Sequence, residues 1–152
     1  MALATCDDFG TIAGATLHIS ATLPATYNEA GFEALSWTEI GGITSIPSVG
    51  ATYGEVSISL VKTGICKKKG TKDFGTATVE FATAISDTGQ IALKTAYASQ
   101  DAASFKILYQ DASADYATGL VMGVPKTNGT GENASMATAT IAWTGDIVET
   151  VS

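Results

Sequence analysis

Hydrophobic and polar residues alternate along most of the chain with a period of two. In one segment Val56, Ile58 and Leu60 would share one face of a strand, while Ser57 and Ser59 share the other. Such alternation, together with many Thr, Val and Ile residues, is typical of half-buried β-strands. The same period recurs in residues 16–21, 76–81 and 104–109, and residues 116–124 and 136–143 are rich in β-forming residues and bounded by turn residues. We therefore predict a mainly β domain, folded as a β-sandwich or β-barrel.

One segment departs from this period and predicts a helix. Asp87 is followed three residues later by Gln90, the spacing of a capping box at a helix start. Apolar residues then recur at spacings of three and four from Ala92 to Tyr97. We predict a single short flanking helix over residues 88–99. The predicted core residues are 56–60, Val79, Phe81, Phe105, Ile107 and Trp143.

Two stretches have the composition of loops. Residues 62–74 hold five of the eight lysines, and residues 125–133 are rich in Gly, Asn and Thr. No internal repeat or low-complexity linker divides the chain. We therefore expect one domain over residues 1–152, with an N-terminal arm at 1–14 and a C-terminal arm at 144–152.

The charge composition limits the partners that this chain can bind. Its 152 residues contain eight Lys, no Arg and fifteen acids, for a net charge of −7. Sequence-specific binding to nucleic acid depends on Lys and Arg contacts, so this composition argues against it. Only 15% of the residues are charged, which favours a surface partly covered by neighbouring subunits. No segment resembles a signal peptide or a membrane span, and we expect no membrane contact.

Residue types that carry catalysis or bind metals are sparse. His18 is the only histidine, and Cys6 and Cys66 are far apart in the sequence, so no zinc-ligand spacing is present. Residues 111–115 resemble the start of a calcium loop but lack its later Gly and Glu. Residues 64–72 lack the spacing of a phosphate-binding loop. We expect no enzyme activity, no cofactor and no metal.

The lysine-rich segment has two possible roles. It could be a solvated hairpin tip, or a basic arm that docks on the acidic surface of another copy. The second interpretation is favoured by charge asymmetry, because the rest of the chain has three lysines against fourteen acids. In that interpretation Lys67, Lys68, Lys69 and Lys72 make contacts between subunits or rings.

Four segments, taken in order, give the sequence a family resemblance. They are residues 31–50 (with Gly-Phe, Leu, Trp, Ile-Gly and a Pro-Gly turn), 69–75, 88–90 and 141–148. In their order and spacing the chain resembles the major tail tube proteins of long, non-contractile-tailed bacteriophages, over about residues 15 to 150.

The resemblance implies a β-sandwich or barrel with one flanking helix, similar to the tubes of contractile tails and type VI secretion. It also implies stacked hexameric rings, with inner strands of neighbouring subunits joined in one barrel around a lumen that conducts viral DNA into the host. The implied partners are other copies of the chain and the tape-measure, tail-terminator and distal tail proteins, with DNA only in passing. The implied location is the virion tail, assembled in the host cytoplasm.

Within that resemblance, residues can be assigned to surfaces. Residues 40–55, the lysine segment, Phe9 and Ile147 would contact other subunits or rings. An acidic lumen would not retain phosphates, and its candidates are the polar faces of strands expected to be neighbours: Ser57, Ser59, Thr76, Thr78 and Glu80. The alternative function is a small carbohydrate- or protein-binding β-sandwich that uses Trp37 and Tyr53.

Overall fold

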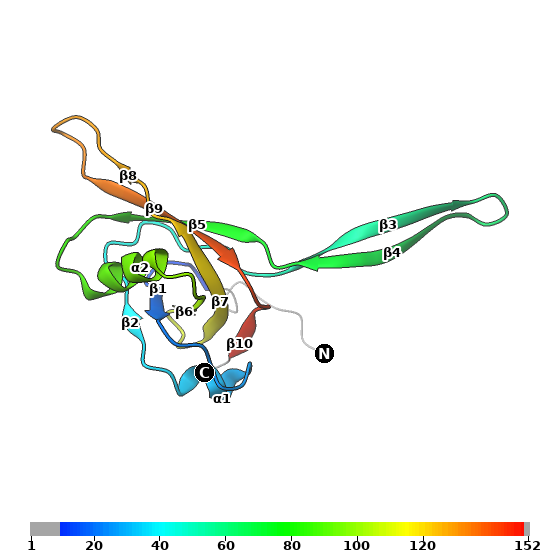
Figure 1. Cartoon of the computed structure of the whole chain (residues 1–152), viewed down its shortest axis with the longest axis horizontal. Helices are drawn as coiled ribbons and strands as arrows, with labels where there is room; N and C mark the ends of the chain where they lie inside the picture. Colours follow the sequence, from blue (N-terminus) through cyan, green and yellow to red (C-terminus); the bar gives the residue numbers. More distant parts are fainter. Residues whose placement is uncertain (1–9, 151–152) are drawn as a thin grey trace.

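Antiparallel strands dominate the computed structural model, which describes residues 10–150 (Figure 1). The elements are β1 (Thr16–Ser20), α1 (Glu29–Glu33), β2 (Thr38–Glu39), β3 (Thr52–Leu60), β4 (Gly64–Asp73), β5 (Thr76–Ala82), α2 (Thr88–Ala98), β6 (Ala103–Leu108), β7 (Ala114–Gly123), β8 (Lys126–Thr127), β9 (Met136–Trp143) and β10 (Val148–Thr150). Figure 1 shows a body built from most of these strands and a long β3–β4 hairpin that projects away from it.

The body is an antiparallel sheet that closes on itself. Its strand order is β2-β1-β6-β7-β9-β5, with β10 paired to β7 and β8 paired to β9. Residues 38–45 connect the two edges of this sheet. Ile40 N donates to Leu17 O on β1 at 2.8 Å, and Thr44 N donates to Glu80 O on β5 at 2.9 Å. The sheet is therefore a barrel, and the predicted fold class is confirmed.

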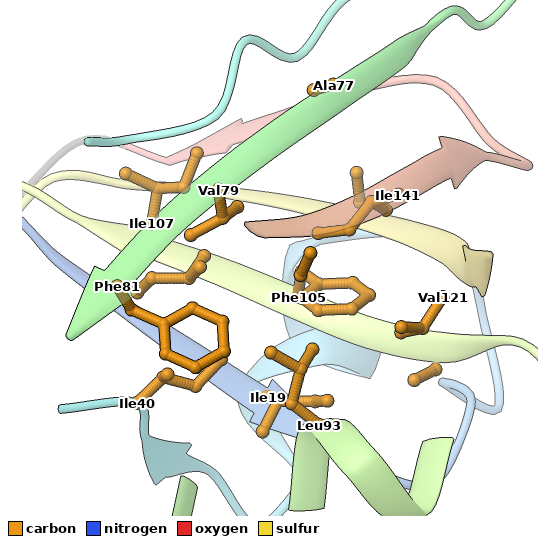
Figure 2. Packing of buried hydrophobic residues seen from close by; sticks show 14 of the residues in the cluster. Ile19, Ile40, Ala77, Val79, Phe81, Leu93, Phe105, Ile107, Val121 and Ile141 are labelled. Atoms are coloured by element: carbon orange, nitrogen blue, oxygen red, sulfur yellow. The ribbon is translucent and has the colours of Figure 1, made fainter. Parts of the chain in front are cut away.

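The inward side chains of the barrel form one hydrophobic core, as the two-residue period predicts. Val79 and Phe81 from β5, Phe105 from β6 and Ile141 from β9 are at most 1% exposed. Figure 2 shows these side chains converging between the strands, with Leu93 of α2 closing one end. Five of the six predicted strand segments correspond to the barrel strands β1, β5, β6, β7 and β9.

Helix α2 confirms the predicted helix and corrects the predicted capping box. The Asp87 carboxylate accepts from Gln90 N at 2.9 Å, as expected of an N-cap. The Gln90 side chain, however, does not return to the backbone of Asp87. It is fully buried, donates to Gly41 O at 2.8 Å and Ala82 O at 2.9 Å, and accepts from Ala84 N at 2.8 Å. One amide thus joins α2, β5 and the segment that closes the barrel.

A second helix, α1, lies on the outside of the barrel and was not predicted. Asn28 caps it by accepting from Gly31 N at 2.8 Å. Its Phe32 is fully buried and stacks on Tyr116 of β7 at 5.2 Å between ring centroids. Trp37 lies 5.7 Å from the same Tyr116 ring. A five-residue helix is too short to show the period that identified α2.

The prediction for residues 55–60 was right about the strand and wrong about its burial. They lie in β3, but Val56, Ile58 and Leu60 are 45–52% exposed and belong to neither hydrophobic cluster of the described residues. The prediction of a loop at 62–74 was also wrong, because Gly64–Asp73 is the long strand β4. Alternation defines two faces of a strand, but it does not specify whether the same chain supplies a layer to cover either face.

Candidate assembly surfaces

The β3–β4 hairpin is a two-stranded sheet separate from the barrel. It is antiparallel from Thr52↔Asp73 to Leu60↔Gly64, with a bulge between Tyr53 and Glu55. Almost every residue of both strands is exposed. Figure 1 shows the hairpin extending well beyond the rest of the fold. An isolated two-stranded hairpin is at best marginally stable in water, and this one gains no further strand from residues 10–150.

The register gives the hairpin two chemically different faces, because residues paired across antiparallel strands project to the same side. We call one the aliphatic face; its residues are Val56, Ile58, Leu60, Cys66 and Lys68. The other, the lysine face, consists of Glu55, Ser57, Ser59, Ile65, Lys67 and Lys69.

The lysines of the hairpin have distinct surroundings. Lys67 Nζ lies 3.8 Å from a Glu55 carboxylate oxygen. Lys69 Nζ lies 4.8 Å from the centroid of the Tyr53 ring, a cation–π contact. Lys68 pairs with Val56 in the register, on the opposite side of the hairpin. The sequence prediction treated these three lysines as one contact, whereas the structure divides them between two faces.

Lys72 is part of the attachment of the hairpin to the barrel. Its Nζ makes a salt bridge with the Asp146 carboxylate in the β9–β10 connection, and it lies 5.5 Å from the Tyr53 ring. The hydrogen bond to Lys72 holds the pKa of Asp146 below its ordinary value, and the same bond raises the pKa of Lys72. Tyr27 Oη donates to Asp146 O at 2.5 Å, which connects the α1 region to this point.

The candidate lumen residues fall on two separate sheets. Thr76, Thr78 and Glu80 lie on the exposed face of β5, and β9 adds Thr138 and Thr140 as their cross-strand neighbours. Ser57 and Ser59 lie on the hairpin, whose strands have no hydrogen-bonded neighbour in the barrel within residues 10–150. The expectation that β3 and β5 are neighbouring strands within one chain was therefore wrong. A turn at Asp73–Gly75 breaks the ladder, with Gly75 at a positive φ of 86°.

The other assigned contact residues lie near the termini. Phe9 lies outside the described residues. Ile147 is half-buried, and its N–H donates to its neighbour Asp146 Oδ1 at 2.9 Å. Ile147 therefore lies beside the attachment point of the hairpin.

Among residues 10–150 no group of three or more His, Cys, Asp or Glu side chains could hold a metal ion. His18 is half-buried; burial lowers its pKa, Lys106 lowers it further, and Glu39 opposes both effects. Trp37 packs on the barrel, whereas Tyr53 lies on the hairpin beside Lys69 and Lys72. No helix among residues 10–150 is long and apolar enough to cross a membrane.

The sequence did contain a signal that β3 is not a core strand. Its partner β4 has Lys67, Lys68 and Lys69 in succession, so both of its faces bear a charge. Unpaired charges are rarely buried. A strand of this kind cannot be central in a core, and its neighbour in a two-stranded hairpin shares its exposure.

Comparison with known structures places this architecture among components of phage tails and injection systems. No family model and no curated protein matches the chain by sequence. A chain of the SPP1 tail tube is similar over 93% of this chain and 80% of that one, with a TM-score of 0.65 and 16% identity. A chain in the sheath/tube terminator of the extracellular contractile injection system PVC gives a TM-score of 0.69 at 8% identity. That match covers 97% of this chain and 100% of the other.

A third similar structure is the tail of a gene transfer agent particle, refined with C6 symmetry. The TM-score is 0.60 at 13% identity, covering 89% of this chain and 96% of that one. At such low identities the likeness concerns the fold, and the chain has the fold of tail tube proteins.

Proposed function

We propose that this protein is a structural, non-enzymatic subunit of a bacteriophage tail tube of the long, non-contractile type. Copies would close into hexameric rings, and the rings would stack into a hollow tube in the virion tail. The tube would be assembled in the host cytoplasm and would conduct DNA during ejection. The expected partners are other copies, the tape-measure, tail-terminator and distal tail proteins, with DNA only in passage.

The observation that carries this proposal is the hairpin, an arm with a face of uncovered aliphatic side chains. Val56, Ile58 and Leu60 are each about half exposed, although they alternate as core residues do. Apolar rows of this kind on a projecting element mark interaction sites. The six-fold symmetry given for the gene transfer agent tail and for the anti-feeding prophage baseplate, a further structure with this fold, supports the ring geometry.

An open strand edge supports the same conclusion. Within the part of the chain that the structure describes, the outer side of β5 is joined near Glu80 and Ala82 alone, by the closing segment around Gly42 and Thr44. From Thr76 toward Thr78 no strand of the described chain lies on that side. Exposed edges promote strand addition from another chain. A ring in which the arm of one subunit reaches the next would cover this edge.

For the lumen we propose the outward face of β5 and β9, the side away from the barrel core. Four threonines, Thr76, Thr78, Thr138 and Thr140, and one acid, Glu80, lie there. A wall with neutral hydroxyls and no lysine would offer few counter-charges to DNA phosphates. DNA would then slide along it without being retained.

Negative-stain microscopy of the concentrated protein tests the proposal. We expect rings or tubes with six-fold end views. A triple variant with Lys67, Lys68 and Lys69 changed to Glu should retain its circular dichroism spectrum and sediment as smaller species. Parent protein that stays monomeric at every concentration would contradict the proposed function.

A further inference from the structure

The two faces of the hairpin differ in how favourably water solvates their side chains. On the aliphatic face, Val56, Ile58 and Leu60 are exposed by 46%, 52% and 45%, in one row at every second residue. Cys66 lies opposite Ile58, so both strands contribute to the apolar strip. No layer of the described chain covers it. Covering this strip would remove apolar surface from water, which favours association.

The lysine face carries one aliphatic side chain, Ile65, which is 68% exposed, and is otherwise made of polar and charged groups. Ser57 Oγ donates to Glu55 Oε1 at 2.8 Å, and the same oxygen lies 3.8 Å from Lys67 Nζ. Lys69 lies over the Tyr53 ring. These groups are already paired in water, and burying them would cost desolvation that such pairs seldom recover.

We propose that a second copy of this chain covers the aliphatic face of the hairpin and leaves the lysine face open to solvent. This inference rests on the proposed tube function and identifies which side of the arm makes the contact. It also means that Ser57, Ser59, Lys67 and Lys69 face the same open space in the assembly, because the register places them together.

Charge identifies the second copy as the occupant. Residues 52–73 contain five lysines and two acids, whereas the rest of the chain has three lysines and thirteen acids. One lysine, Lys68, lies on the aliphatic face beside Val56. An apolar strip that carries Lys68 therefore fits the acidic body of an identical subunit, which is present at equal concentration. Lys68 would pair with an acid there, while Lys72 stays with Asp146 of its own chain.

Thiol reactivity separates the two faces directly. The parent for this test is the Cys6→Ser variant, in which Cys66 reports on the aliphatic face. The matched control adds Cys66→Ser and Ser57→Cys, which moves the reporter to the lysine face. In tubes relative to dilute subunits, we expect maleimide labelling of Cys66 to slow by at least about tenfold, because the thiol is excluded from water. Labelling of the S57C variant should change by less than about twofold.

Labelling of Cys66 at an unchanged rate in tubes would overturn the inference, and so would protection of the thiol in the S57C variant. These results leave the proposed function standing, because tubes have formed. If the parent forms no rings or tubes at any concentration, the proposed function fails, and the inference fails with it.

Assembly measurements provide a second, independent test. Ile58→Ser should raise the subunit concentration needed for tube formation by about tenfold or more, since it removes an apolar contact. Lys68→Glu should also raise it, whereas Lys67→Glu should change it by less than about twofold. Circular dichroism of dilute subunits should match the parent for all three. A larger effect of Lys67→Glu than of Lys68→Glu would contradict the assigned face.

Discussion

Strands β3 and β5 have the same alternating pattern and opposite surroundings. Ala77, Val79 and Phe81 of β5 are at most 8% exposed, because β9 pairs beside them and the barrel closes over them. Val56, Ile58 and Leu60 of β3 are about half exposed, because within residues 10–150 β3 pairs with β4 alone. An amphipathic strand therefore contributes to the core of its own chain when other segments cover its apolar face. When they do not, the apolar face is available for contact with another chain.

The two regions should therefore differ in what their side chains stabilise. Side chains in the barrel act on the free energy of unfolding of the single subunit. Side chains on the hairpin act on association, because their apolar surface stays in water until a partner covers it. Variants in each region test whether barrel side chains act on folding and hairpin side chains act on association.

The largest expected effect is Phe105→Ala in the barrel. Phe105 is 1% exposed and packs edge-on against Trp143 at 5.6 Å between ring centroids. Its truncation should lower the free energy of unfolding by about 3–5 kcal/mol, through lost burial and a cavity. Urea unfolding below the assembly concentration measures this. The matched hairpin variant, Ile58→Ala, should lower it by less than about 1 kcal/mol. Equal losses would remove the distinction between the regions.

A second, smaller effect is expected for Gln90→Ala. This change removes the fully buried Gln90 amide and leaves Gly41 O, Ala82 O and Ala84 N without that partner. We expect the free energy of unfolding to fall by about 2–3 kcal/mol. Thr95→Ala on the exposed side of α2 is the control and should cost less than about 0.5 kcal/mol. If both variants unfold at the same urea concentration, the buried amide does not hold the closing segment.

The smallest effect concerns the junction between the regions. Asp146→Asn removes the ion pair with Lys72, and we expect faster amide exchange at the base of the hairpin with no change in β9. Global stability should hardly change, because exposed pairs contribute little. Protection factors from hydrogen exchange measure the difference. Uniform exchange rates across parent and variant would mean that other contacts hold the hairpin.

The same pair predicts a pH window for that protection. The folded pKa of Asp146 is lowered, so its contribution is present above the ordinary value of 3.8 and is lost as pH falls through the folded pKa. The folded pKa of Lys72 is raised, so its contribution is present below 10.5 and is lost as pH rises through the folded value. The D146N variant should lack this profile.

Much of the barrel was predictable because its signals are local. The two-residue period located β1, β5 and β6, β-forming composition between turn residues located β7 and β9, and Asp87 marked the start of α2. Helix α1 was missed because its stability comes from Phe32 packing on Tyr116, a residue far away in the sequence. The role of Gln90 was misjudged for a similar reason, since its partners at Gly41 and Ala82 become neighbours only after the barrel closes.

The candidate surfaces were predictable only in part. Lys67, Lys68 and Lys69 marked a segment outside the core, but consecutive residues of a strand point to alternate sides. The three lysines could form one basic cluster only if their segment were a loop, in which consecutive side chains need not alternate. The strand β4 instead divides them between two faces, and its register places Ser57 beside Lys67.

The sequence by itself determined which residues of each strand share a face, because that depends only on the local backbone period. It also determined that the hairpin is basic and the remainder acidic. Only the tertiary structure decided which faces are buried. Burial depends on which distant segments close over a strand, and residues 38–45 close the barrel while no segment of the described chain closes over β3 and β4.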